Sequence, residues 1–149
     1  MRAAGARFAV ITVLQRQERA FADLARKYGL GDRVSGTIGI GVPVLALETD
    51  RETALAGTIN GSRQAVSGGA TSIVFGCTGM LGFADEVSAA LDGISVIDPL
   101  LNAIEFAHKA IQSGQKNDKS IYPYPDSKLT AGFEGWTALD ALMKGKRDD

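Results

Sequence analysis

The sequence predicts an α/β fold: a four-stranded parallel sheet flanked by helices, followed by a C-terminal tail with a short helix. Four short apolar runs rich in β-branched residues alternate with segments whose apolar residues recur at helical spacing. That alternation is typical of parallel strands joined by right-handed helical crossovers. The chain has 149 residues, 45% of them hydrophobic, and 18 glycines. The length suits one domain, and the glycines indicate tight strand-to-helix turns or backbone that approaches a ligand.

The first two strands are expected at residues 8–14 and 34–40, the second with glycines that blur its ends. A helix is expected over 16–28, because its apolar positions recur at i, i+3, i+4 and i+7 before a glycine stop. The next helix should begin with a capping box between Thr49 and Glu52 and end at two glycines. One face of it is expected to comprise Leu55, Ile59, Ser62 and Val66.

The following segments repeat the pattern. A buried strand is expected at 71–75, and a short helix at 85–91. A fourth strand at 94–97 ends at Asp98-Pro99, a pair that also starts helices. The last helix should end at Gly114 and carry one apolar stripe formed by Leu100, Ile104, Ala107 and Ile111.

These elements place one α/β domain in residues 1–114 and a C-terminal extension in 115–149. The extension shows no sheet pattern. It does carry apolar groups and a short amphipathic helix around Leu139, Leu142 and Met143. We therefore expect it to pack on this domain or on a partner domain.

Charge and cysteine content exclude several classes of function. Sixteen Lys and Arg residues balance 17 Asp and Glu residues, so no basic excess attracts nucleic acid. No apolar run is long enough to cross a membrane, and a signal-peptide pattern is absent at the start. Cys77 is the single cysteine, which excludes an internal disulfide and a cysteine-based zinc site, and we expect no metal. Together these features predict a cytoplasmic protein.

Chemistry is expected where the strands end, because open parallel sheets bind ligands at the carboxyl ends of their strands. Thr12 lies near the end of the first expected strand, and Cys77 and Asp98 follow the third and the fourth. By residue type alone, Cys77 is more often a small core residue than a catalyst. Asp98 is equally well explained as a site residue and as the start of a helix.

The loop Gly76-Cys77-Thr78-Gly79 favours the catalytic interpretation of its cysteine. The two glycines let the backbone turn tightly and approach a ligand. The amides of Thr78, Gly79 and Met80 open the next helical stretch, so we expect them to bind a carboxylate or another oxyanion and to favour a thiolate. A thiol in that position can take and return a proton.

At this point the residues resemble a known family. Ile73 to Met80 (IVFGCTGM) is similar to the second cysteine motif of the cofactor-independent aspartate/glutamate/hydantoin racemase superfamily, closest to its hydantoin racemase branch. Phe8 to Thr12 resembles the strand that opens the second domain of that branch, Tyr28 to Leu30 the turn after its first helix, and Val42 to Leu45 the loop before its second. The resemblance covers residues 7–114 and corresponds to the C-terminal half of such enzymes.

The resemblance implies an enzyme of two similar α/β domains, with the active site between them and one cysteine in each. One thiolate removes the proton α to the substrate's carboxylate or carbonyl, and the opposite thiol protonates the other face, without a cofactor or metal. On this mapping Cys77 is the second-domain acid/base, Thr78 and the Gly79 amide hold the carboxylate-like group, and Thr12 lines the site. The implied substrate is a small carboxylate or a hydantoin-like molecule.

The chain has no counterpart of the first-domain cysteine, which leaves three hypotheses open. The protein is a racemase or epimerase acting on amino acids or hydantoin derivatives, inactive if the chain is truncated. Alternatively it is a single-cysteine, decarboxylase-like lyase, or a non-catalytic remnant that binds a small carboxylate or dimerises. The second acid/base group would come from a missing first domain, or from a homo-oligomer that opposes two Cys77 thiols across a twofold axis.

Overall fold

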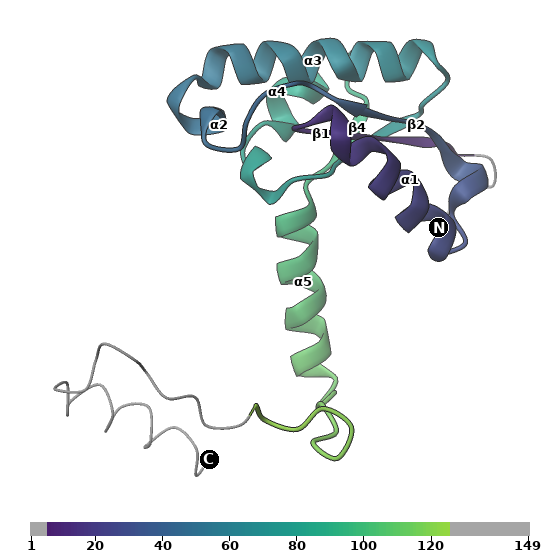
Figure 1. Ribbon diagram of the computed structural model, residues 1–149, viewed down its shortest axis with the longest axis vertical. Helices are drawn as coiled ribbons and strands as arrows, with labels where there is room; N and C mark the ends of the chain where they lie inside the picture. Colours follow the sequence, from purple (N-terminus) through teal and green to yellow (C-terminus); the bar gives the residue numbers. More distant parts are fainter. Residues whose placement is uncertain (1–5, 126–149) are drawn as a thin grey trace, which may run out of the picture. The chain divides into compact units, whose positions relative to one another are not determined.

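The computed structural model describes residues 6–125 of the chain (Figure 1). Parallel strands alternate with helices, which confirms the α/β class. The strands are β1 (Phe8–Thr12), β2 (Val34–Gly39), β3 (Ser72–Phe75) and β4 (Ser95–Ile97). The α-helices are α1 (Glu18–Lys27), α2 (Ala46–Thr49), α3 (Arg51–Ser67), α4 (Ala84–Ala89) and α5 (Pro99–Gln112). Single 3-10 turns are η1 (Gln15–Gln17), η2 (Gly31–Arg33) and η3 (Thr78–Met80).

The sheet has the strand order β2-β1-β3-β4, and each neighbouring pair is parallel. β1 is central, with Ala9 in register with Gly36 of β2 and Ile73 of β3. Because the chain extends the sheet first on one side of β1 and then on the other, right-handed crossovers place their helices on opposite faces. Figure 1 shows this arrangement, with α3 on one side of the sheet and α1 on the other.

The core follows the centre of the sheet. Four of the five residues of β1 are buried, whereas Gly39 is the one buried residue of β2 and β4 has none. Residues from the loops and helices complete the core cluster, among them Leu47, Met80, Phe83 and Val87. The carboxyl ends of β1 and β3 are therefore anchored on packed apolar side chains.

Helix α3 faces the sheet mainly with small residues, and the expected face is confirmed in part: Ser62 is buried, and Leu55 and Ile59 pack against the core. Its buried positions are Ala54, Thr58, Gly61, Ser62 and Ala65, while Val66 is 37% exposed. The reason is close approach: an ideal Cβ on Gly61 would lie 3.4 Å from Cγ2 of Ile38 and 3.8 Å from Cδ1 of Ile11. The branched strand residues fill the space between helix and sheet, so the helix contributes little bulk there.

The start of α3 also differs from the expected capping box. Asp50 is the N-cap, and its Oδ1 accepts a hydrogen bond from the Thr53 amide at 3.4 Å. Thr49 instead ends the short helix α2, where its Oγ1 donates to the Leu45 carbonyl. Aspartate and threonine are both good N-caps. Because α2 ends at Thr49 and α3 begins at Arg51, Asp50 is the residue that occupies the N-cap position of α3.

The apolar stripe of α5 does not cover the sheet. None of the α5 residues is buried against the described part of the chain, and Ile104 and Ile111 are 58% and 76% exposed. The helix begins with a proline in its first turn and with Asp98 as its N-cap, both of which favour a helix start. Asp98 Oδ1 accepts hydrogen bonds from the amides of Leu100 and Leu101 at 2.8 and 3.3 Å.

The chain divides into two compact units, Met1–Gly114 and Gln115–Asp149. The short helix expected around Leu139, Leu142 and Met143 lies outside the described residues. Within residues 6–125, none of the helices has the length and apolar character needed to cross a bilayer.

Replacing Gly39 with Ala tests how closely the β1 and β2 loops pack. The new Cβ would lie 2.3 Å from the Gln15 amide nitrogen and 2.5 Å from the Leu14 carbonyl carbon, so backbone must move. We expect a loss near the upper end of the ~1–3 kcal/mol seen for overpacking, measured by urea unfolding. Gly57→Ala is the matched control: its Cβ makes ordinary contacts with Ile40, and helix propensity predicts a gain of about 0.5–1 kcal/mol. Equal stability for the two variants would contradict this packing.

The ion pair between Arg51 and Glu86 predicts a pH dependence. Arg51 starts α3 and joins Glu86 of α4, and it lies 4.9 Å from the Phe83 ring centre. Its guanidinium holds the pKa of Glu86 below the ordinary value of 4.5, so the pair stabilises the fold above that pH and is lost as pH falls through the lowered pKa. Glu86→Gln should therefore have a slightly lower Tm than the parent near neutral pH and an equal Tm in acid. A Tm gap that persists unchanged into acid would show that the charge is not its cause.

Candidate functional site

The loop after β3 places Cys77 at the carboxyl edge of the sheet. Cys77 is half-buried and extended, with φ -142° and ψ 129°, and the exposed residues Thr78 and Gly79 follow it. Next comes one 3-10 turn, closed by hydrogen bonds from the Met80 amide to the Cys77 carbonyl at 3.2 Å and from the Leu81 amide to the Thr78 carbonyl at 3.3 Å. The thiol thus sits on a tight turn at the surface.

The prediction for Met80 is corrected by this turn. Its amide is occupied by the Cys77 carbonyl, and its side chain is fully buried in the core. By contrast, the amides of Thr78 and Gly79 donate no hydrogen bond to any residue in the described part of the chain. Two amides beside the thiol, rather than three, are therefore open to an oxyanion.

The expected helix terminus behind the thiol is also corrected. η3 has three residues and ends at Met80, and α4 begins only at Ala84. A turn of that length has no helix macrodipole to speak of, because the dipole sums over many aligned peptides. Any stabilisation of a thiolate or oxyanion here comes from the individual amides of Thr78 and Gly79.

Glycine at position 79 leaves room next to the thiol. An ideal Cβ there would lie 3.5 Å from Cys77 Sγ, 3.0 Å from Leu47 Cδ1 and 3.8 Å from Val44 Cγ1. The loop between β2 and α2 therefore borders the cysteine loop with apolar side chains. Leu47 is buried, whereas Val44 is half exposed. Sequence reasoning did not place these two residues beside Cys77, because their contact depends on the tertiary fold.

Thr12 lies under the cysteine loop rather than on its surface. It is fully buried, and its Oγ1 donates to Gln17 Oε1 at 3.0 Å. A Cβ on Gly76 would come within 3.0 Å of Thr12 Cβ and 2.9 Å of Phe21 Cζ, so the glycine rests directly on both side chains. Thr12 with Gln17 thus supports the loop, a role for Gln17 that the sequence did not reveal.

Asp98 acts as a helix cap next to this edge. β4 pairs with β3 through Ile97 and Val74, which places Asp98 one residue beyond that pair. Asp98 as a residue is 4% exposed, and its Oδ1 accepts hydrogen bonds from the first amides of α5. Of the two interpretations offered by the sequence, the structure supports the helix start. The Oδ2 atom of Asp98 is buried without a hydrogen-bond partner among the described residues.

The described residues offer no group of three or more His, Cys, Asp and Glu side chains placed to hold a metal ion. A groove of about 560 Å³ lies elsewhere, between α1 and β2, and contains none of the residues predicted for the site. The chemistry of a thiol beside two open amides favours the cysteine loop as the candidate active site.

The fold and the candidate site together define the class of protein: an α/β domain with a cysteine loop at the carboxyl end of its third strand. The Asp/Glu/Hydantoin racemase family model matches residues 1–107, and the chain belongs to this family.

Named relatives agree with this assignment. The chain is 35% identical over 129 residues to a hydantoin racemase from Pseudomonas sp. (strain NS671), covering 85% of this chain and 51% of the relative. It is 35% identical over 130 residues to a hydantoin racemase from Rhizobium meliloti, covering 86% and 54%. The chain thus spans about half the length of the curated relatives it matches.

Solved structures show the same domain. An allantoin racemase from Pseudomonas fluorescens has a TM-score of 0.71 and 27% identity, covering 86% of this chain and 55% of that protein. An allantoin racemase from Klebsiella pneumoniae has a TM-score of 0.72 and 28% identity, covering 85% and 53%. The sheet and the helices around it therefore have the fold of a domain found in known racemase structures.

Gly79→Ala tests whether the space beside the thiol is real. The added methyl group needs only a small shift of the flexible end of Leu47, so stability should change by less than about 1 kcal/mol. Because that methyl group lies 3.5 Å from Cys77 Sγ, the folded variant should react severalfold more slowly with a bulky disulfide reagent than the folded parent chain does. Labelling in denaturant is the internal control and should proceed at equal rates. Equal rates in the native state would mean that position 79 does not border the thiol.

Proposed function

We propose that this chain forms the Cys77 side of a cofactor-independent racemase or epimerase active site, acting at the α carbon of amino acids or hydantoin derivatives. The observation that carries the proposal is the half-buried thiol beside two open amides, at the carboxyl end of β3, in a member of the racemase family. The named relatives are racemases of hydantoin and allantoin, which supports a hydantoin-like ring as the first substrate to test.

Each residue of the loop has a distinct part in the proposed step. The Cys77 thiolate takes the α proton and becomes a thiol, and the C–H electron pair moves into the adjacent carbonyl to give an enolate. The amides of Thr78 and Gly79 hydrogen-bond the oxygen where that negative charge develops. The thiol then returns a proton to carbon, and the carbonyl reforms. Thr12 and Met80 act from below, by holding the loop in place.

Inversion needs a second acid/base group on the opposite face of the substrate. A single thiol returns the proton to the face from which it was taken, so it exchanges the α proton without changing the configuration. Cys77 is the chain's one cysteine. We propose that the second group comes from a second copy of the chain or from another domain that faces the loop.

The single thiol also supports a cytoplasmic location, since it must remain reduced to act as an acid/base. Decarboxylation by one thiol and simple carboxylate binding use the same loop, but no described contact and no named relative favours either. They serve below as alternative outcomes.

Proton exchange in D2O tests the proposal. With 5-substituted hydantoins, aspartate and glutamate, NMR should show deuterium entering at the α carbon of at least one substrate faster than in buffer alone. Cys77→Ala should lower that rate by about 10²–10⁴-fold, the usual contribution of a general acid/base. Chiral chromatography of the same samples separates exchange with retention from inversion.

A matched control moves the thiol. Cys77→Ala combined with Ala56→Cys keeps one cysteine but puts it on the exposed face of α3, and it should remain as slow as Cys77→Ala alone. Absence of exchange with every substrate, or exchange unaffected by loss of Cys77, would contradict the proposal. Decarboxylation of a disubstituted malonate without any exchange would favour the lyase.

A further inference from the structure

Arg51 contacts the segment through which the cysteine loop leads into α4. Its Nη2 donates a hydrogen bond to the Gly82 carbonyl at 3.4 Å and pairs with the Glu86 carboxylate on α4. Its guanidinium lies 4.9 Å from the centre of the Phe83 ring, within the range of a cation–π contact. One side chain of α3 thus meets a backbone carbonyl, a carboxylate and an aromatic ring of this segment.

The carbonyl of Gly82 has its partner in Arg51. Gly82 has a φ of +83°, a left-handed conformation that glycine adopts without steric cost. None of the backbone amides in the described residues donates to its carbonyl, and the Arg51 side chain is the one hydrogen-bond donor to it there. The end of the cysteine loop is therefore tied to α3 by this contact.

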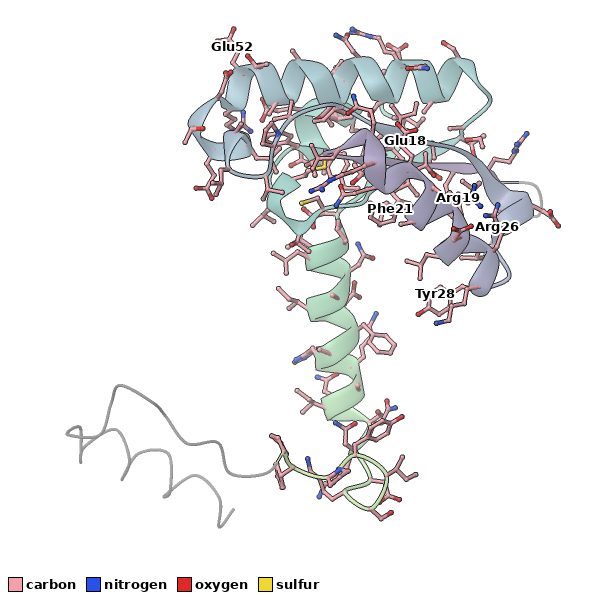
Figure 2. All side chains as sticks on the ribbon, viewed as in Figure 1. Glu18, Arg19, Phe21, Arg26, Tyr28 and Glu52 are labelled. Carbon is pink, nitrogen blue, oxygen red and sulfur yellow. The ribbon has the colours of Figure 1, made fainter. Side chains whose placement is uncertain are left out.

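Arg51 also adjoins the other segment that borders the thiol. It is the first residue of α3, two positions after the end of α2, and α2 carries Leu47. Leu47 Cδ1 lies 3.0 Å from the Cβ that Gly79 would bear beside Cys77. Glu52, the next residue along, marks this end of α3 in Figure 2. Arg51 thus fastens the corner between α2 and α3 to the end of the cysteine loop.

We propose that Arg51 is a positioning residue for the cysteine loop. By fixing Gly82 and Phe83 against α3, it keeps the two open amides aligned with the Cys77 thiol. This role rests on the proposed function of the loop. Donors that stabilise an enolate must be aligned before the charge develops, and a displacement of about 1 Å can cost 10²-fold in rate.

Positioning of the loop is separable from global stability. The side chains of Arg51 and Glu86 are 48% and 47% exposed, and ion pairs at that exposure contribute little to the free energy of unfolding. Met80 and Phe83 already anchor the turn in the core. Loss of Arg51 should therefore leave the fold intact, while the surface part of the loop gains freedom.

Arg63 offers a matched control. It also lies on α3 and is exposed, and its Nη2 donates to the Ala90 carbonyl at the other end of α4, at 3.5 Å. Arg63→Ala therefore removes the same kind of contact between the same two helices, at the end of α4 that does not adjoin the cysteine loop.

Backbone dynamics of the full chain without ligand test the role of Arg51 independently of catalysis. In Arg51→Ala, the NMR order parameters of the Thr78 and Gly79 amides should fall from about 0.85, typical of rigid backbone, towards about 0.6. Arg63→Ala should leave both at parental values. Thermal unfolding should give both variants a Tm close to that of the parent. Arg51→Lys keeps the charge but loses the planar fork of donors, so its order parameters should lie between those of the parent and Arg51→Ala.

Proton exchange at the α carbon supplies a second measurement. With a substrate that the parent exchanges, Arg51→Ala should lower kcat and kcat/KM together by about tenfold, with KM unchanged, as expected when an interaction of the transition state is lost. Order parameters that stay parental in Arg51→Ala, or that fall equally in Arg63→Ala, would overturn the proposal, and so would a parental kcat. A parent chain that exchanges none of the substrates would contradict the proposed function, and the order parameters would still decide the role of Arg51.

Discussion

The close approach of three loops at the carboxyl edge of the sheet is the constraint on which the candidate site depends. Two glycines make it possible. At Gly39 the end of β2 touches the backbone of Leu14 and Gln15, and at Gly76 the end of β3 rests on Thr12 and Phe21. Any side chain at either point would push the loops apart. Because β1 lies between β2 and β3, these contacts gather their ends around a single turn, the one that carries Cys77.

The turn that carries Cys77 is packed against the core on one side and open on the other. Met80 and Phe83 are buried below it, and Thr12 is tied to Gln17, so the backbone at Cys77 is held from the core side. Above it, two amides point to no described partner. Preorganised donors of this kind stabilise an enolate without reorganising as charge develops, which is why a cofactor-independent proton transfer can use them.

The sequence alone predicts most of the fold. Apolar runs alternating with helical periods predict the sheet, which the structure confirms. The ligand loop that the glycines around Cys77 predict stays a prediction. The errors arose where tertiary packing decides. The buried face of α3 is made of residues such as Ala54 and Gly61, whose hydrophobic signal is weak although their small size lets the helix approach the sheet. Likewise, no local pattern indicates that Val44 and Leu47 border the thiol, or that the Met80 amide is consumed by its own turn.

An amide-resolved NMR titration of the 149-residue chain with a 5-substituted hydantoin tests the central claim, that the cysteine loop receives the substrate. The two open amides report directly on an oxyanion or carbonyl that binds them. The account predicts that Thr78 and Gly79 show the largest chemical-shift changes, with smaller changes at Val44 and Leu47. Changes confined to the groove along β2, with none at Thr78 and Gly79, would contradict it.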